Sequence, residues 1–302
     1  MKKTLLFLFL IAPCWLWAQN TPVYDQYHFN SYLINPAAAG VNFDGLSISL
    51  LDRHQWIGIQ GAPQTNTFSI TKSFMSGPAL GAFVANDSYG LMRDLYVRAS
   101  FSYSSQIEKT NNRHVSLGIA FEGSQFSYDK SYDNPIVMTD RGIRDAIPSA
   151  LTYDASMGFI FYGDKGFFSV SATNFLKRKI TSDSEPSYIY AMIDKKGQIS
   201  RWMWLDISYL LKFSSKLDAE MDVTAKLIYK NKVWGGLSYR TPRALLALMG
   251  MNYKKYAIGY GFEYSLSKMM ASTYGTHELF LSYNIPNNRK KRKNTPACPA
   301  YY

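Results

Sequence analysis

Residues 217–230 read LDAEMDVTAKLIYK, and this stretch decides the fold because apolar and polar side chains alternate along it. Successive side chains of a β-strand point to opposite faces, so Leu217, Met221 and Leu227 share one face and Asp218 and Glu220 share the other. A helix of this sequence would place leucines and carboxylates around its whole circumference. The stretch therefore predicts a β-strand with one apolar face and one charged face.

The same alternation recurs in residues 94–103, 115–122, 151–161 and 256–265. A soluble β-sandwich would also alternate, but its wet face would be rich in Lys and Glu. Here the polar face holds mostly Ser, Gly, Ala and Thr with isolated charges, while the apolar face is large and aromatic. Such faces are typical of strands with lipid outside and a polar lumen inside. The pattern therefore favours a transmembrane barrel over a sandwich.

Strand-like segments follow one another at near-regular spacing, separated by Gly, Pro, Asn and Asp. They are 46–56, 64–74, 79–89, 94–106, 113–127, 151–162, 166–174, 187–193, 201–213, 217–230, 232–240, 243–252, 256–266 and 277–285. We predict an all-β transmembrane antiparallel β-barrel of about 14 strands. About 12 strands is the alternative, because bacterial barrels prefer even numbers and segments 187–193 and 243–252 alternate poorly.

The N-terminus reads as an export signal at residues 1–18, with Lys2 and Lys3 before an apolar run and cleavage after Ala18. A lipoprotein reading at Cys14 is weakened by Pro13 directly before it. The apolar run is shorter than the ~20 residues that a spanning helix needs, and no later run approaches that length. Aromatic residues make up 16% of the chain and charged residues 18%, which suits a membrane interface. We therefore expect an exported protein of the outer membrane, in contact with its lipid.

The expected organisation continues with a non-strand N-terminal segment at 19–45, a barrel at 46–286 and a basic C-terminal tail at 287–302. The N-terminal segment is rich in aromatics and is expected to pack inside or beneath the barrel. Long connections at 128–150 and 176–186 contrast with short turns such as 230–232. With an even strand number, both termini should lie in the periplasm, on the side of the short turns.

The formal net charge of +11 does not indicate nucleic-acid binding, because five cations form one terminal run and the others are scattered among strands. The run is Arg289, Lys290, Lys291, Arg292 and Lys293. It could meet periplasmic partners or anionic headgroups, or be a solvated tail. After signal cleavage Cys298 is the one cysteine left, which makes it a free or intermolecular thiol.

Nothing in the sequence indicates catalysis, a metal site or a cofactor. The four histidines have no metal-ligand spacing, and no nucleophile or phosphate-binding motif is present. His114 and His277, each near the start of a strand, are best read as interfacial polar residues. The charges at Asp218, Glu220, Asp222, Lys226 and Lys230 share one face, and an internal salt-bridge ladder in the lumen is the preferred interpretation.

A block of ordered motifs in the N-terminal part resembles a known family, with a further match at Gly275-x-His277-Glu278-Leu279. The motifs contain Gln26, Tyr27, Asn30, Asn35, Pro36, Gly40, Arg53, Gln55, Trp56, Gly61 and Pro63. In order and spacing they are similar to the PorP/SprF family of outer-membrane proteins of Bacteroidetes. Residues 124–200 carry no matching motif.

The resemblance implies a non-enzymatic component of the type IX secretion system and, in gliding species, of the gliding apparatus. Such a protein would engage a periplasmic ring lipoprotein and its partner (PorK and PorN), in places through a peptidoglycan-binding adaptor (PorE). It would be needed for secretion or surface display of cargo proteins. A structural role for the motif residues is the alternative: Asn35 and Pro36 would shape a turn, and Arg53, Gln55 and Trp56 would tie the N-terminal segment to the first strand. A porin-like channel is the rival function.

Overall fold

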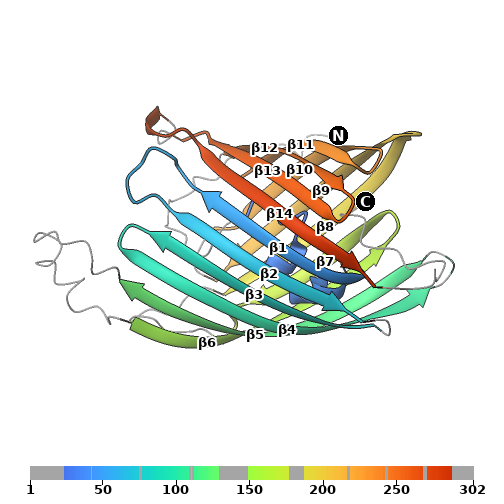
Figure 1. The fold of residues 1–302 in the computed structure, drawn as a ribbon, viewed down its shortest axis with the longest axis horizontal. Coiled ribbons are helices and arrows are strands. Elements are labelled where there is room, and N and C mark those ends of the chain that lie inside the picture. Colours follow the sequence, from blue (N-terminus) through green and yellow to red (C-terminus); the bar gives the residue numbers. More distant parts are fainter. Residues whose placement is uncertain are drawn as a thin grey trace, which may run out of the picture.

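The computed structural model describes residues 24–41, 43–74, 77–108, 110, 112–128, 149–176, 187–215, 218–241, 244–267 and 271–287. These residues form a closed antiparallel barrel in which each strand pairs with its neighbour in sequence (Figure 1). The strands are β1 Gly45–His54, β2 Gln64–Ser73, β3 Pro78–Tyr89, β4 Met92–Glu108, β5 Arg113–Tyr128, β6 Ser149–Gly163, β7 Gly166–Thr173, β8 Tyr188–Ser200, β9 Met203–Ser214, β10 Glu220–Tyr229, β11 Val233–Arg240, β12 Ala244–Tyr253, β13 Tyr256–Ser265 and β14 Thr276–Pro286. The predicted barrel of 14 strands is confirmed.

Two strand boundaries differ from the prediction by three residues or more. Strand β8 continues to Ser200 instead of ending at residue 193, because Asp194 and Lys196 are buried toward the lumen rather than marking a turn. Strand β10 begins at Glu220, so Asp218 precedes it. In β8 the prediction was too short because a lumen can accept charges that would end a strand in an apolar core.

The two faces of the sheet differ as the alternation predicted. Phe121, Tyr153 and Leu237 on the outer face are each at least 70% exposed. Ser116, Ser208 and Thr224 on the inner face are fully buried. Large apolar side chains exposed around a closed sheet match the lipid-facing surface of an outer-membrane barrel. Among the described residues, no helix is long and apolar enough to cross a membrane.

Both ends of the barrel sequence meet at one rim, where Gly45 of β1 pairs with Pro286 of β14. The same rim carries tight turns, including residues 164–165, 230–232 and 254–255. The opposite rim carries longer connections, among them residues 55–63 and 266–275. We call these the short-turn rim and the long-loop rim.

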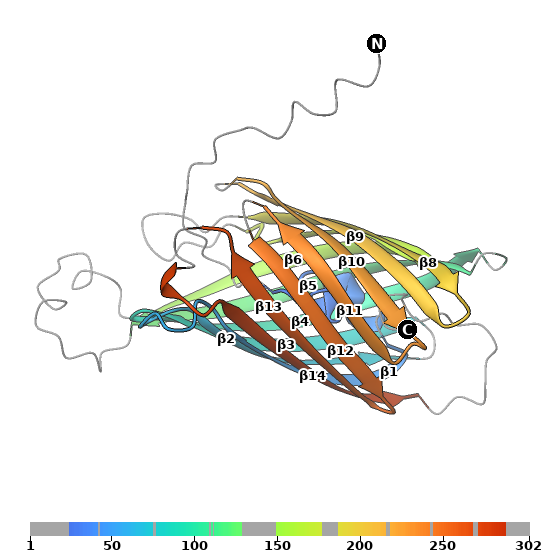
Figure 2. The same cartoon turned by 90° about the horizontal axis from the view of Figure 1, so that it is seen from above.

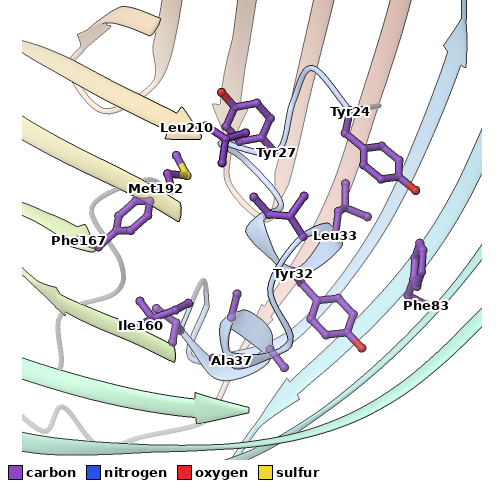
Figure 3. Close-up of a cluster of buried hydrophobic side chains, with 14 of the residues drawn as sticks. Tyr24, Tyr27, Tyr32, Leu33, Ala37, Phe83, Ile160, Phe167, Met192 and Leu210 are labelled. Carbon is purple, nitrogen blue, oxygen red and sulfur yellow. The ribbon is translucent and has the colours of Figure 1, made fainter. Parts of the chain in front are cut away.

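Residues 24–41, which we call the plug, lie inside the barrel (Figure 2). The plug contains two short 3₁₀ helices, η1 Ser31–Leu33 and η2 Pro36–Gly40. Its side chains pack against lumen-facing residues of distant strands, as Figure 3 shows for Tyr32 and Leu33 of the plug beside Phe83 of β3. The main hydrophobic cluster of the described residues is therefore an interface between the plug and the barrel wall.

Candidate functional site: the plug and its ionic anchor

The first residues of the plug are held by buried charges from five strands. We call this group the ionic anchor; it consists of Asp25, Arg53, Asp222, Arg240, Glu263 and Glu278. Arg53 of β1 is fully buried and forms an ion pair with Asp25 of the plug. Its guanidinium also lies 2.9 Å from Glu263 of β13 and 3.2 Å from Glu278 of β14. Arg53 of β1 therefore connects the plug to β13 and β14.

Arg240 of β11 makes a second set of contacts with the same carboxylates. Its guanidinium donates hydrogen bonds to Asp25 at 2.8 Å, to Glu263 at 3.0 Å and to Asp222 of β10 at 2.9 Å. Asp25 is thus clamped between two arginines. Buried charges must be paired because desolvation of a lone charge is costly, so the anchor depends on every member.

Glu278 also binds the plug backbone. Its carboxylate accepts hydrogen bonds from the amides of Asp25 at 2.9 Å and Gln26 at 2.7 Å. The Gln26 side chain donates in return to the Glu278 carbonyl at 3.1 Å. A Cβ added at Gly259 would lie 2.1 Å from the Gln26 Oε1 atom, so glycine is what allows the plug this close to β13.

Arg98 of β4 holds the middle of the plug. It donates hydrogen bonds to the carbonyls of Tyr32 at 3.1 Å and Leu33 at 3.0 Å, while its Nε atom pairs with Glu122 of β5 at 2.6 Å. These carbonyls belong to η1, and the carbonyls of a short helix need partners from outside it. The Arg98 guanidinium therefore donates the hydrogen bonds that the amides of a further helical turn would otherwise donate to these carbonyls.

Asn35 fixes η2 against the wall. Its side-chain oxygen accepts from the amide of Ala37 at 2.8 Å, which caps the helix, and Pro36 follows at the first helical position. Its amide nitrogen lies 2.8 Å from the Ser169 hydroxyl of β7 and 3.2 Å from the Phe159 carbonyl of β6. The prediction that Asn35 and Pro36 shape a turn is confirmed, and the same side chain also fastens the turn to the barrel.

We expect Asn35→Ala to lower the free energy of unfolding by about 2 kcal/mol, because it removes a helix cap and the hydrogen bonds that fasten η2 to β6 and β7. The measurement is urea unfolding of the purified protein in detergent, followed by tryptophan fluorescence. Asn66→Ala on β2 is the matched control, since that side chain is exposed and its hydrogen bond to the Asp52 carboxylate lies at the surface. Equal losses in the two variants would contradict the role assigned to Asn35.

Phe29 and Asn30 of the plug contact the barrel wall near the short-turn rim. The Phe29 ring stacks on Trp234 of β11 at 3.8 Å between centroids, and Lys226 of β10 lies 5.1 Å from the same ring. The Asn30 amide donates to the Ser69 hydroxyl of β2 at 2.9 Å. Through these contacts, Phe29 and Asn30 connect β11 on one side of the lumen with β2 on another.

The predicted salt-bridge ladder exists in the lumen, but its pairs run across strands rather than along β10. Lys226 pairs with Asp206 of β9 at 3.0 Å, and Asp222 pairs with Arg240 of β11. Same-face neighbours along a strand are roughly 6.6 Å apart, whereas directly opposite residues on adjacent strands have Cβ atoms about 5 Å apart. Lys230 lies exposed in the turn after β10 and stands outside this ladder.

Four predicted residues shape loops at the long-loop rim. The Gln55 amide donates to the Pro63 carbonyl at 2.9 Å, and the Gly61 carbonyl accepts from Gly90 at 2.8 Å. The Trp56 amide donates to the Thr276 hydroxyl at 3.2 Å. Of the three residues expected to tie the N-terminal segment to β1, Arg53 has that role, whereas Gln55 and Trp56 bond within this rim.

The remaining predicted residues divide into two groups. Tyr27 is buried in the plug, and at Gly40 an added Cβ would lie 2.6 Å from the Ala79 Cβ atom of β3, so close packing explains the glycine. The basic run, Arg289, Lys290, Lys291, Arg292 and Lys293, and Cys298 lie outside the described residues. Their roles stay predictions. Within the described part of the chain, no group of three or more His, Cys, Asp or Glu is placed to hold a metal ion.

Sequence reasoning missed Asp25, Arg98 and Arg240 as site residues. Each is a single charged residue in a strand or loop, and its partner is distant in sequence. Asp25, for example, pairs with Arg240. The available signal was the presence of charged residues at lumen-facing positions, where a buried Arg or Asp needs a partner.

A closed antiparallel barrel with an apolar outer face and a polar, occupied lumen defines an integral β-barrel protein of the outer membrane. The chain belongs to the family described as type IX secretion system membrane protein PorP/SprF, which matches residues 16–283. Membership confirms the resemblance noted from the motifs and places the protein in the outer membrane.

Solved structures support the fold. The CymD monoaromatic hydrocarbon channel is similar with a TM-score of 0.55 and 10% identity, covering 86% of this chain and 94% of that one. The Pseudomonas putida toluene transporter TodX is similar with a TM-score of 0.51 and 11% identity, covering 86% of this chain and 95% of that one. At such identities the likeness shows the fold alone. No curated protein matches the chain.

Proposed function

We propose that this protein is a scaffold that anchors the periplasmic ring of the type IX secretion system to the outer membrane, and so supports export or surface display of cargo. The partners would be a PorK-like ring lipoprotein and its PorN-like companion, with a PorE-like peptidoglycan-binding adaptor in some settings. Family membership supports the secretion system, and the rest of the proposal depends on how the barrel is filled and oriented.

The orientation follows from the connections. Short turns of outer-membrane barrels face the periplasm and long loops face outward. The short-turn rim, where Gly45 and Pro286 meet, therefore faces the periplasm, and the tail that follows residue 287 begins there. Exposed lysines in the turns at 230–232 and 254–255 make this rim basic. It is the surface that periplasmic partners can reach.

The observation that carries the proposal is the plug. A conduit needs a continuous open lumen, but the described lumen is crossed by residues 24–41, whose core side chains are buried. Beside the plug, the cavities near Tyr190 have volumes of only about 30 and 60 Å³. A barrel filled by its own chain has a rigid rim, which suits attachment better than transport.

Chemical crosslinking in intact cells, followed by purification of this protein, tests the scaffold directly. We expect periplasmic lipoproteins of the secretion system to copurify. Deleting residues 289–302 should leave the barrel folded, as judged by a heat-dependent shift in gel mobility, but should weaken the association. Copurification of no periplasmic protein with the full chain would contradict the proposed function.

The rival function is a channel, and two fold relatives are described as a hydrocarbon channel and a toluene transporter. In planar bilayers we expect the full chain to show no steady conductance, because the plug and its ionic anchor close the lumen. A variant lacking residues 24–41 is the positive control and should conduct. Steady conductance of the full chain, equal to that of the deletion variant, would favour the channel.

A further inference from the structure

A cavity of about 480 Å³ lies between the plug and the short-turn rim, and we call it the vestibule. Its inner wall is formed by Phe29 and Asn30 of the plug and by Trp234 of β11. Its mouth is formed by the turns after β10 and β12 and by the ends of β1 and β14. Cavities of several hundred Å³ are large enough for a ligand or a short stretch of peptide.

The lining of the vestibule contains lysines and no carboxylate. The lysines are Lys226, Lys232, Lys254 and Lys255. Lys226 is buried and neutralised by Asp206 at 3.0 Å. The other three are exposed, and none forms an ion pair with a described residue. The mouth therefore has three positive charges without an ion-pair partner among the described residues, and the Lys254 amine lies 5.2 Å from the centre of the Tyr253 ring.

Backbone hydrogen bonds join the two turns that carry these lysines to the neighbouring strands. The Asn252 amide donates to the Lys232 carbonyl at 2.7 Å, and the Asn284 amide donates to the Lys255 carbonyl at 2.7 Å. The turn after β10, the turn after β12 and the end of β14 are therefore consecutive along the rim. Like charges on consecutive turns raise the local potential and attract an anionic partner.

The inner part of the vestibule differs from its mouth. The stacked rings of Phe29 and Trp234 lie at its inner end, and the buried ring of Phe280 of β14 also lines its wall. Asn30 and Ser49 add hydrogen-bonding groups to the wall. An occupant that fits both parts has carboxylates at the mouth and apolar or aromatic side chains further in.

We propose that the vestibule receives an acidic peptide segment of a periplasmic protein partner, inserted from the short-turn rim. This inference rests on the proposed function and identifies its contact site and the chemistry of its partner. A free inorganic anion would leave the aromatic wall unused. The basic run at 289–293 follows β14 closely, but its five cations would be repelled by the three lysines.

The test uses the full chain purified in detergent and a fluorescein-labelled octapeptide of alternating Glu and Tyr, with binding followed by fluorescence anisotropy. We expect saturable binding that weakens as salt is raised, because exposed charges are screened. A peptide with Lys in place of each Glu should not bind. A photo-crosslinker on the acidic peptide should label segments that contain Trp234 or Phe280.

The key variant reverses three charges, Lys232→Glu with Lys254→Glu and Lys255→Glu. We expect affinity for the acidic peptide to fall about tenfold or more, from three exposed charge pairs at roughly 0.5 kcal/mol each. The matched control reverses Lys165, Lys195 and Arg201, which lie near the same rim but do not line the vestibule. Its net charge changes equally, and its affinity should stay within about twofold of the full chain, since charges beyond a Debye length are screened. A heat-dependent gel shift confirms that each variant is folded, and Lys→Gln changes at 232, 254 and 255 provide a milder version.

Three results would overturn the inference. One is unchanged affinity in the folded triple variant. Another is an equal loss in the matched control, which would show bulk attraction only. The third is much tighter binding by a variant ending at Asn287, which would make the tail the natural occupant. If the peptide fails to bind while crosslinking still recovers periplasmic proteins, this inference is wrong and the scaffold stands; if the peptide binds and no periplasmic protein copurifies, the scaffold is wrong.

Discussion

Arg53→Met is expected to lower the free energy of unfolding by about 3–5 kcal/mol, the cost of breaking a buried ion pair from one side. Arg53 neutralises Asp25, Glu263 and Glu278, and methionine would leave these carboxylates buried with Arg240 as their remaining cation. Since Asp25 belongs to the plug, the first consequence should be release of the plug from β14. Urea unfolding in detergent measures the loss, and brief openings in planar bilayers should report the released plug.

The neighbouring residue provides a matched control. His54 pairs with Asp52 at the surface, and both side chains are more than a third exposed, so His54→Ala should change stability by less than about 0.5 kcal/mol. Adding Glu263→Gln to Arg53→Met should restore part of the lost stability, because one unpaired carboxylate is removed. If Arg53→Met unfolds at the same urea concentration as the unsubstituted protein, the ionic anchor does not hold the plug.

Gly118→Ala is expected to expel η2 from its place against β5 and to destabilise the protein by about 1–3 kcal/mol, the usual cost of overpacking. An added Cβ would lie 2.4 Å from the Ala37 nitrogen and 2.5 Å from its Cα atom. Backbone atoms cannot rotate away as a flexible side chain can, so either the plug or the strand must move. Urea unfolding and bilayer conductance together measure the effect.

Gly123→Ala on the same strand is the control. The nearest atom to its added Cβ is 3.9 Å away, which is ordinary contact, and alanine is no worse than glycine in a strand. We therefore expect stability equal to that of the unsubstituted protein, or slightly higher, and no conductance. Equal behaviour of the two alanine variants would show that β5 does not need close contact with the plug.

The sequence alone determined the strands and the direction in which their faces point. Alternation is local: in the stretch around Met221 and Leu227, the same side chains that share a face in sequence share the lipid surface in the barrel. The strand number of about 14 and the resemblance of residues 26–69 to a family followed from spacing along the chain. These properties depend on neighbours in sequence, and so could be predicted without coordinates.

Only the tertiary structure decided what the motif residues do. Asn35 reads as a turn residue, and its contacts with Phe159 and Ser169 appear only when β6 and β7 form the wall beside η2. Arg53 meets Asp25 and Glu278 because barrel closure brings β1 against β14 and directs their side chains to one lumen. Ion pairing depends on distance in space, and the closed sheet joins residues that are far apart in the chain. Whether residues 24–41 fill the lumen therefore depends on closure of the barrel, which the local alternation of side chains does not predict.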